Sequence, residues 1–183
     1  MNLPNKLTIV RLIIIPFFLI LMVVPFDWGS VTFWGATIPV AELIAAILFI
    51  AATITDNLDG RIARRDHLVT NFGKFADPLA DKLLVMTAFI VLTGQGVVPS
   101  WVTAIIIWRE LSVTGLRLLL VEQNGTVLAA KMPGKIKTTT QFIAIIFLLL
   151  HNVIFAIWNI PFGQIMLYIC LFFTVYSCLL YTS

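Results

Sequence analysis

Six long apolar runs, separated by short polar stretches, limit the folds open to this chain more than any other feature. The runs span approximately residues 5–25, 39–60, 75–94, 98–121, 136–158 and 163–182. Their apolar residues follow one another continuously, whereas a strand with one exposed face would alternate apolar and polar positions. Each run is also close to the ~20 residues that a helix needs to cross the hydrocarbon core of a bilayer. The pattern therefore predicts six helices.

Composition bears on whether these helices form a soluble bundle or a membrane protein. Of the 183 residues, 60% are hydrophobic and 11% are charged. A soluble domain has roughly 45–50% apolar and about 25% charged residues, so this chain has too few polar groups to cover a surface in water. We therefore expect an all-α integral membrane protein, a single domain over residues 1–183 with six transmembrane helices in a lipid bilayer.

The basic residues predict how these helices are oriented. All twelve Lys and Arg residues lie near the N-terminus or around the second and fourth connecting segments, namely Lys6, Arg11, Arg61, Arg64, Arg65, Lys74, Lys82, Arg109, Arg117, Lys131, Lys135 and Lys137. Because cytoplasmic loops are enriched in Lys and Arg, both termini are expected on the cytoplasmic side of the cell membrane. This basic face would suit anionic headgroups or phosphorylated substrates, and nucleic acid is not expected as a partner.

Four aspartates lie close together between residues 56 and 81. Asp56 and Asp59 are three residues apart near the end of the second run, and Asp77 and Asp81 are four apart at the start of the third. Residues at these spacings share one helix face, and a connection of about 15 residues would let the two helices bring both pairs together. Converging carboxylates need a compensating charge. Oxygen ligands suit Mg²⁺ or Mn²⁺, and two such ions form a clamp for displacement at phosphorus.

The aspartates could also serve as a helix cap or as part of an ion path. Asp77 precedes Pro78, a pair typical of a helix N-cap with proline in the first turn, although capping would not explain the remaining three aspartates. The acidic cluster could instead line the ion path of a cation transporter. Such a site normally lies near the membrane midplane, whereas these acids gather at one end of the predicted helices, which favours an enzyme.

The spacing of the acidic stretch resembles the signature of a known enzyme family. Residues Asp56-x-x-Asp59-Gly60-x-x-Ala63-Arg64, followed after eight residues by Gly73-x-x-x-Asp77-x-x-x-Asp81, match the CDP-alcohol phosphatidyltransferases at all eight fixed positions. The six predicted helices also agree with that family's architecture. The resemblance implies that two divalent ions, Mg²⁺ or Mn²⁺, are held by Asp56, Asp59, Asp77 and Asp81, with Asp81 also acting as general base. It further implies CDP-diacylglycerol as the phosphatidyl donor, a homodimer, and a nucleotide site formed by Asp56, Gly60, Ala63, Arg64 and Gly73.

Basic residues outside this signature bear on the alcohol that accepts the phosphatidyl group. Arg109 and Arg117 are eight residues apart in the fourth run, on roughly the same helix face, and Lys135 and Lys137 open the fifth. Their convergence would form a pocket for a phosphate group, while the alternative is that they snorkel towards lipid headgroups. The segments around them resemble those of the bacterial family members that use glycerol 3-phosphate. Inositol phosphate, serine and phosphatidylglycerol remain alternative acceptors.

Overall fold

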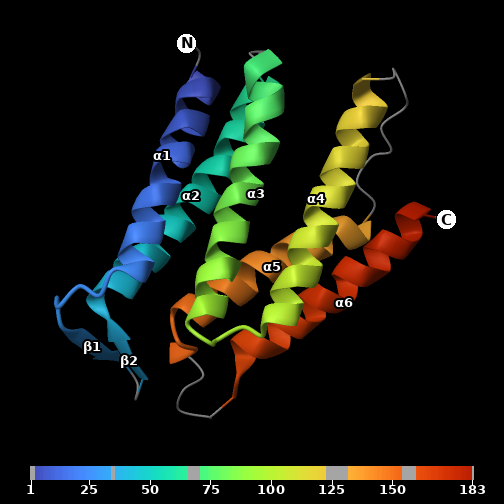
Figure 1. Cartoon of the computed structure of the whole chain (residues 1–183). Helices are drawn as coiled ribbons and strands as arrows, with labels where there is room; N and C mark the ends of the chain where they lie inside the picture. Colours follow the sequence, from blue (N-terminus) through green and yellow to red (C-terminus); the bar gives the residue numbers. More distant parts are fainter. Residues whose placement is uncertain (1–2, 34–35, 66–70, 123–131, 154–159, 183) are drawn as a thin grey trace.

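The computed structural model describes six helices and one two-stranded sheet (Figure 1). The backbone is described for residues 3–33, 36–65, 71–122, 132–153 and 160–182, and side chains for residues 9–32, 37–55, 79–80, 82–116, 136–153 and 160–177. In chain order the elements are α1 (Leu3–Val23), β1 (Ser30–Phe33), β2 (Ala36–Pro39), α2 (Val40–Arg65), α3 (Asn71–Gly94), α4 (Ser100–Glu122), α5 (Met132–Leu149) and α6 (Phe162–Thr182). The prediction of six helices is confirmed.

The predicted membrane-spanning character of these helices is wrong. Across the described ranges, no helix combines enough length with enough apolar character to cross a bilayer. Charge interrupts the predicted runs, since Arg109 and Glu110 lie inside α4 and Lys137 lies inside the 18-residue α5. Part of the apolar content of these helices packs into a shared core between them. The predicted localisation in the cell membrane stays a prediction.

The two helices that carry the aspartates extend further than their apolar runs. α2 continues to Arg65 and α3 begins at Asn71, so the connection between them, residues 66–70, is shorter than expected. The added segments contain Ala, Arg and Lys, which are good helix formers. Each helix therefore continues beyond the end of its apolar run. In Figure 1, α2 and α3 run in opposite directions and form a helical hairpin.

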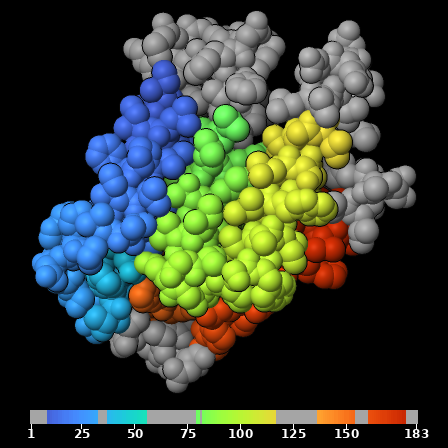
Figure 2. All heavy atoms as spheres, viewed as in Figure 1, coloured from blue at the N-terminus to red at the C-terminus, as the bar shows by residue number. Residues whose placement is uncertain are grey.

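The remaining helices pack around this hairpin. α1 packs against both α2 and α3, and α4 packs against α3 and α6. Figure 2 shows α1, α3 and α4 next to one another on one face of the molecule. α5 runs along α6 and also contacts α2 and α3, which places it behind the other helices in the view of Figure 1.

A core of large apolar side chains holds these helices in place. Phe49 of α2 lies between two other rings, with centroid distances of 6.0 Å to Phe18 of α1 and 6.1 Å to Phe142 of α5. Phe89 of α3 and Leu167 of α6 are fully buried in the same cluster. Because protein interiors are close-packed, this core sets how the polar segments of the helices meet.

A short antiparallel hairpin between α1 and α2 was not predicted. In it, Val31 lies opposite Ile38 and Thr32 lies opposite Thr37. These β-branched residues favour extended backbone, and Ile38 is almost completely buried. Four-residue strands do not stand out in a sequence beside long apolar runs, which explains the omission.

Gly96 and Pro99 lie in the turn between α3 and α4. Gly96 adopts a φ of 75°, a conformation that glycine reaches without steric cost. Pro99 directly precedes α4. The hydroxyls of Thr93 and Thr103 lie 2.6 Å apart across this turn and join α3 to α4.

Candidate active site

The four aspartates lie on the helical hairpin of α2 and α3. Asp59 is six residues before the end of α2, and Asp77 is six residues after the start of α3. Asp56 and Asp81 are nine and ten residues from the same two ends. Since a helix rises about 1.5 Å per residue, the members of each of these pairs lie at nearly equal distances from the connection. The backbone thus places the four carboxylate-bearing positions along matching parts of two antiparallel helices (Figure 1).

The interpretation of Asp77 as a helix N-cap is wrong. α3 begins at Asn71, so Asp77 lies inside the helix and Pro78 lies beyond its first turn. Proline has no backbone N–H, which leaves the carbonyl of Lys74 without its usual helical donor. Capping therefore does not account for Asp77.

The side chains of several predicted site residues lie outside the described part of the structure. They belong to Asp56, Asp59, Asp77, Asp81, Arg64, Arg117 and Lys135. Gly60 and Ala63 lie on α2 in the turn that follows Asp59, and Gly73 lies near the start of α3. The metal-binding and nucleotide-binding roles of these residues stay predictions.

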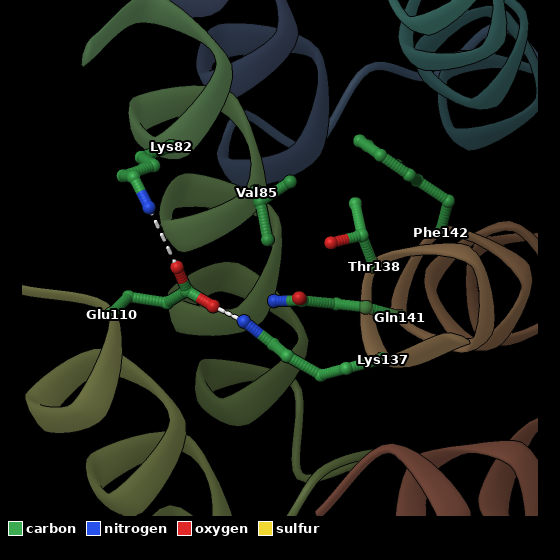
Figure 3. A pocket seen from close by; sticks show the side chains of 7 residues that line it. All are labelled: Lys82, Val85, Glu110, Lys137, Thr138, Gln141 and Phe142. Carbon is green, nitrogen blue, oxygen red and sulfur yellow. Dashed lines mark hydrogen bonds and ion pairs between the residues drawn. The ribbon is translucent and has the colours of Figure 1, made fainter. Parts of the chain in front are cut away.

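A small polar cavity lies between α3, α4 and α5 (Figure 3). Its volume is about 70 Å³, and the residues that line it are Lys82, Val85, Glu110, Lys137, Thr138, Gln141 and Phe142. α3 contributes Lys82 and Val85, α4 contributes Glu110, and α5 contributes the rest. Residues from three separate parts of the chain therefore form one polar site.

Glu110 joins two lysines across this cavity. The Lys82 Nζ donates a hydrogen bond to Glu110 Oε2 at 2.8 Å. The Lys137 Nζ forms an ion pair with the other carboxylate oxygen, Oε1. Lys137 and Glu110 are both buried, and a buried charge is tolerated only when it is paired. The three side chains therefore depend on one another.

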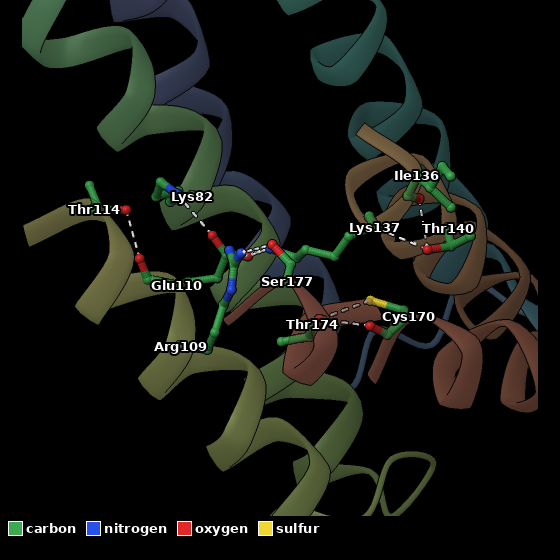
Figure 4. Close-up of polar contacts among 10 residues, drawn as sticks. All are labelled: Lys82, Arg109, Glu110, Thr114, Ile136, Lys137, Thr140, Cys170, Thr174 and Ser177. Carbon is green, nitrogen blue, oxygen red and sulfur yellow. Dashed lines mark hydrogen bonds and ion pairs between the residues drawn. The ribbon is translucent and has the colours of Figure 1, made fainter. Parts of the chain in front are cut away.

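Arg109 lies next to this cluster but does not line the cavity. Its Nη2 donates a hydrogen bond to Ser177 Oγ at 2.7 Å, which ties α4 to α6. Its Nη1 lies 3.8 Å from Glu110 Oε1 (Figure 4). Arg109 thus adds positive charge near the carboxylate while its position is set by α6.

Of the four basic residues predicted to hold a phosphate group, Lys137 lines the cavity and Arg109 contacts Glu110. Lys135 lies two residues before Lys137 on α5. At 3.6 residues per turn, positions two apart lie about 200° apart around a helix and do not face each other. The inclusion of Lys135 and Arg117 in the same site stays a prediction.

Of the seven residues that line this cavity, sequence reasoning predicted only Lys137 and missed the other six, including Lys82, Glu110 and Gln141. Lys82 directly follows Asp81, and Glu110 is the one acidic residue between positions 98 and 121. A single carboxylate within an apolar run, next to an arginine, is a signal that could have been used. Gln141 carries no comparable signal, because an amide in a helix is common.

The cavity lies close to the acidic hairpin along α3. Lys82 occupies the position directly after Asp81 on that helix, and consecutive helical residues differ by only about 1.5 Å in height. The lysine that anchors Glu110 and the aspartate predicted as general base therefore belong to the same helical turn.

Comparisons with known proteins identify the family of this chain. Residues 1–176 match the family model described as CDP-alcohol phosphatidyltransferase. Over 176 residues the chain is 53% identical to the CDP-diacylglycerol--glycerol-3-phosphate 3-phosphatidyltransferase of Bacillus subtilis (strain 168), a match that covers 96% of this chain and 91% of that protein. A protein with the same description from Salmonella paratyphi A is 36% identical over 186 residues, covering 100% of this chain and 93% of its own length.

A further relative comes from Mycobacterium tuberculosis (strain CDC 1551 / Oshkosh). This probable phosphatidylglycerophosphate synthase is 40% identical over 144 residues, which cover 79% of this chain and 64% of that protein. The family resemblance predicted from the acidic signature is confirmed, and with it the prediction of an enzyme. The chain belongs to the CDP-alcohol phosphatidyltransferase family.

Proposed function

We propose that this enzyme transfers a phosphatidyl group from CDP-diacylglycerol to glycerol 3-phosphate and releases CMP. The descriptions of its relatives in Bacillus subtilis and Salmonella paratyphi A name CDP-diacylglycerol, glycerol 3-phosphate and phosphatidyl transfer for those proteins. The observation in this chain that carries the proposal is the cationic cavity of Lys82 and Lys137, which adjoins the turn containing Asp81. An acceptor with a phosphate group would find complementary charge there.

Members of this family are generally metal-dependent. For this chain we propose two divalent ions, Mg²⁺ or Mn²⁺, held by Asp56, Asp59, Asp77 and Asp81. All four are oxygen donors on the two antiparallel helices of one hairpin, a donor set that suits these hard cations. When bound, such ions neutralise negative charge on a diphosphate that is losing its leaving group.

The protein's own groups would bind and orient the two substrates. Gly60, Ala63 and Gly73 have no large side chains, so a nucleotide can approach the backbone of α2 and α3 closely there. Arg64 would pair with a phosphate of the same nucleotide. Asp81 would accept the proton of the acceptor's hydroxyl, which must be held within hydrogen-bond reach of that carboxylate.

The cationic cavity would hold the other end of the acceptor. Lys82 lies on the same turn as Asp81, so a phosphate bound near its Nζ would keep the acceptor's free hydroxyl close to the general base. Holding the reacting groups in place lowers the entropic cost of the transfer. Serine has no phosphate group, and would make no use of this cavity.

A panel of acceptors tests the proposed substrate. Purified enzyme with CDP-diacylglycerol and Mg²⁺ is expected to release CMP faster with glycerol 3-phosphate than with inositol phosphate, serine or phosphatidylglycerol, because the relatives are named for that acceptor. CMP release is measured by chromatography. A faster rate with any other acceptor would contradict the assignment of glycerol 3-phosphate.

The role of Asp81 has its own test. Asp81→Asn is expected to lower CMP release at least 100-fold, since general base catalysis contributes typically 10²–10⁴-fold, while binding of a CDP-containing nucleotide persists. Transfer is measured together with nucleotide affinity by calorimetry. Full turnover in the variant, with metal content unchanged, would exclude Asp81 as the base.

We also propose that the enzyme forms a homodimer. Large apolar side chains are exposed on α3 and α4, among them Leu83, Ile90, Trp108, Leu111 and Leu116. Extended exposed apolar surface often marks an association site. Analytical ultracentrifugation of the purified protein is expected to give twice the mass of the 20.4 kDa chain. A monomeric mass at all protein concentrations would contradict this.

A further inference from the structure

The cavity between α3, α4 and α5 contains one carboxylate among its lining residues, and both lysines that line it are paired with that carboxylate. Each of the two oxygens of Glu110 meets a different lysine (Figure 3). A phosphate group binds lysines in the same way, through charge-assisted hydrogen bonds to separate oxygens. Glu110 thus makes the contacts that a bound phosphate would make.

Three cationic side chains gather around Glu110. Lys82, Lys137 and Arg109 each lie within ion-pair distance of its carboxylate. A phosphate monoester has a charge of about −1.5 to −2 near pH 7, so it could interact with these cations in place of the carboxylate, whereas a neutral alcohol could not.

Gln141 provides a second indication that the cavity takes a ligand. Its side chain is 4% exposed and lines the cavity, yet its Nε2 has no hydrogen-bond partner among the side chains and backbone that the structure describes. Buried amide groups are nearly always hydrogen-bonded. The cavity volume of about 70 Å³ is several times the ~10–15 Å³ that one water requires by the same kind of measure. A phosphate oxygen could accept the missing hydrogen bond.

We propose that Glu110 is an internal counter-ion that holds the place of the acceptor's phosphate group and releases Lys82 and Lys137 to that phosphate when the acceptor binds. The proposal rests on the proposed function for the identity of the acceptor, but not for the exchange itself. Arg109, fixed by Ser177 and close to the carboxylate, keeps a partner for Glu110 after the exchange. Each buried charge of the cluster therefore has an oppositely charged partner both before and after the acceptor's phosphate binds.

An internal counter-ion acts as a competitor for the phosphate. If the lysines are engaged by Glu110 about nine-tenths of the time, the apparent affinity for phosphate is lowered about tenfold, because only the remaining fraction can bind. Glu110 also offsets the repulsion between the half-buried Lys82 and the buried Lys137 before the acceptor arrives. The residue therefore lowers the affinity for phosphate while it stabilises the empty site.

Substitution of the carboxylate by an amide tests the proposal. Glu110→Gln is expected to lower the melting temperature in phosphate-free buffer, because the lysines lose their counter-ion. Added inorganic phosphate should restore it, with a half-saturating concentration about tenfold below that of the wild type. The measurement is differential scanning fluorimetry of the full chain with Mg²⁺ present, over a series of phosphate concentrations.

A second readout connects the exchange to catalysis. Inorganic phosphate should inhibit CMP release competitively against glycerol 3-phosphate, with an inhibition constant lower in Glu110→Gln than in the wild type. If glycerol 3-phosphate is not the acceptor, this inhibition fails while the thermal response to phosphate remains. The two experiments thus separate a failure of the proposed function from a failure of the role of Glu110.

Glu42→Gln is the matched control. Glu42 also pairs with a cation, His151, but it lies in the first turn of α2, away from the cavity. Its loss should lower the melting temperature without changing the response to phosphate.

If Glu110→Gln does not fold, Glu110→Asp serves as a second variant. Its shorter side chain cannot reach both lysines, so tighter phosphate binding is again expected. Weaker phosphate binding in either variant at position 110 would overturn the proposal and make Glu110 a residue that positions the lysines.

Discussion

At the scale of single residues, the connection between α5 and α6 depends on close contacts at Gly163. The backbone N–H of Gly163 donates to Asn152 Oδ1 at 2.7 Å, and Asn152 has a φ of 53°, in the left-handed region. A Cβ at position 163 would lie 2.8 Å from that oxygen and 2.9 Å from Leu148 Cδ2. Leu148 is almost completely buried, so it has little room to move.

Gly163→Ala is therefore expected to destabilise the protein. Forcing a methyl group into a packed site costs about 1–3 kcal/mol, and the hydrogen bond to Asn152 would be strained as well. The free energy of unfolding is measured by denaturant titration. Gly115→Ala in α4 is the control, because a Cβ there meets no atom of the described residues within 4 Å. Equal stability of the two variants would contradict the crowding at position 163.

At the scale of elements, an ion pair joins the start of α2 to the end of α5. His151 Nε2 lies 2.6 Å from Glu42 Oε2, and Gln95 Nε2, beyond the end of α3, donates to Glu42 Oε1 at 3.3 Å. The hydrogen bond to Glu42 raises the pKa of His151 above 6.5, burial partly opposes this change, and the charge of Glu42 adds to it. The protonated imidazole is therefore favoured in the folded state.

This raised pKa predicts how stability depends on pH. His151 binds its proton more tightly when folded, so its contribution is fully present below about pH 6.5 and is lost as the pH rises through the raised pKa. We expect the melting temperature of the wild type to fall from about pH 6 towards about pH 9 by more than that of His151→Gln, which has no titrating group at this position. Identical pH profiles of the two proteins would rule out the ion pair as the cause.

Also at the scale of elements, the hairpin of α2 and α3 shows that a sequence pattern predicts the presence of a helix better than its ends. The apolar runs predicted the two helices that carry the aspartates, and α2 and α3 are those helices. The ends of these helices were placed less well, because apolar runs mark buried segments and not the full length of a helix. The N-cap interpretation of Asp77 failed for the same reason: helix-forming residues continue α3 back to Asn71.

At the scale of the whole molecule, the polar cavity exists because three helices meet. Lys82, Glu110 and Lys137 are 28 and 27 residues apart along the chain and come together only through the packing of α3, α4 and α5. Arg109 adds a link to Ser177 of α6, 68 residues away. Separations of this size leave no periodicity in the sequence, since helical patterns relate residues three or four positions apart.

The sequence by itself determined the number of helices, the acidic signature and, through it, the family. These properties follow from local regularities, namely runs of apolar residues and fixed spacings on one helix. Composition alone does not determine the surroundings of those helices, because an apolar side chain can be buried against another helix as well as against lipid. The pairing of Glu110 with Lys82 and Lys137, and the amide of Gln141 beside them, were decided only by the tertiary structure. Charges attract across space, and the fold determines which of them are neighbours.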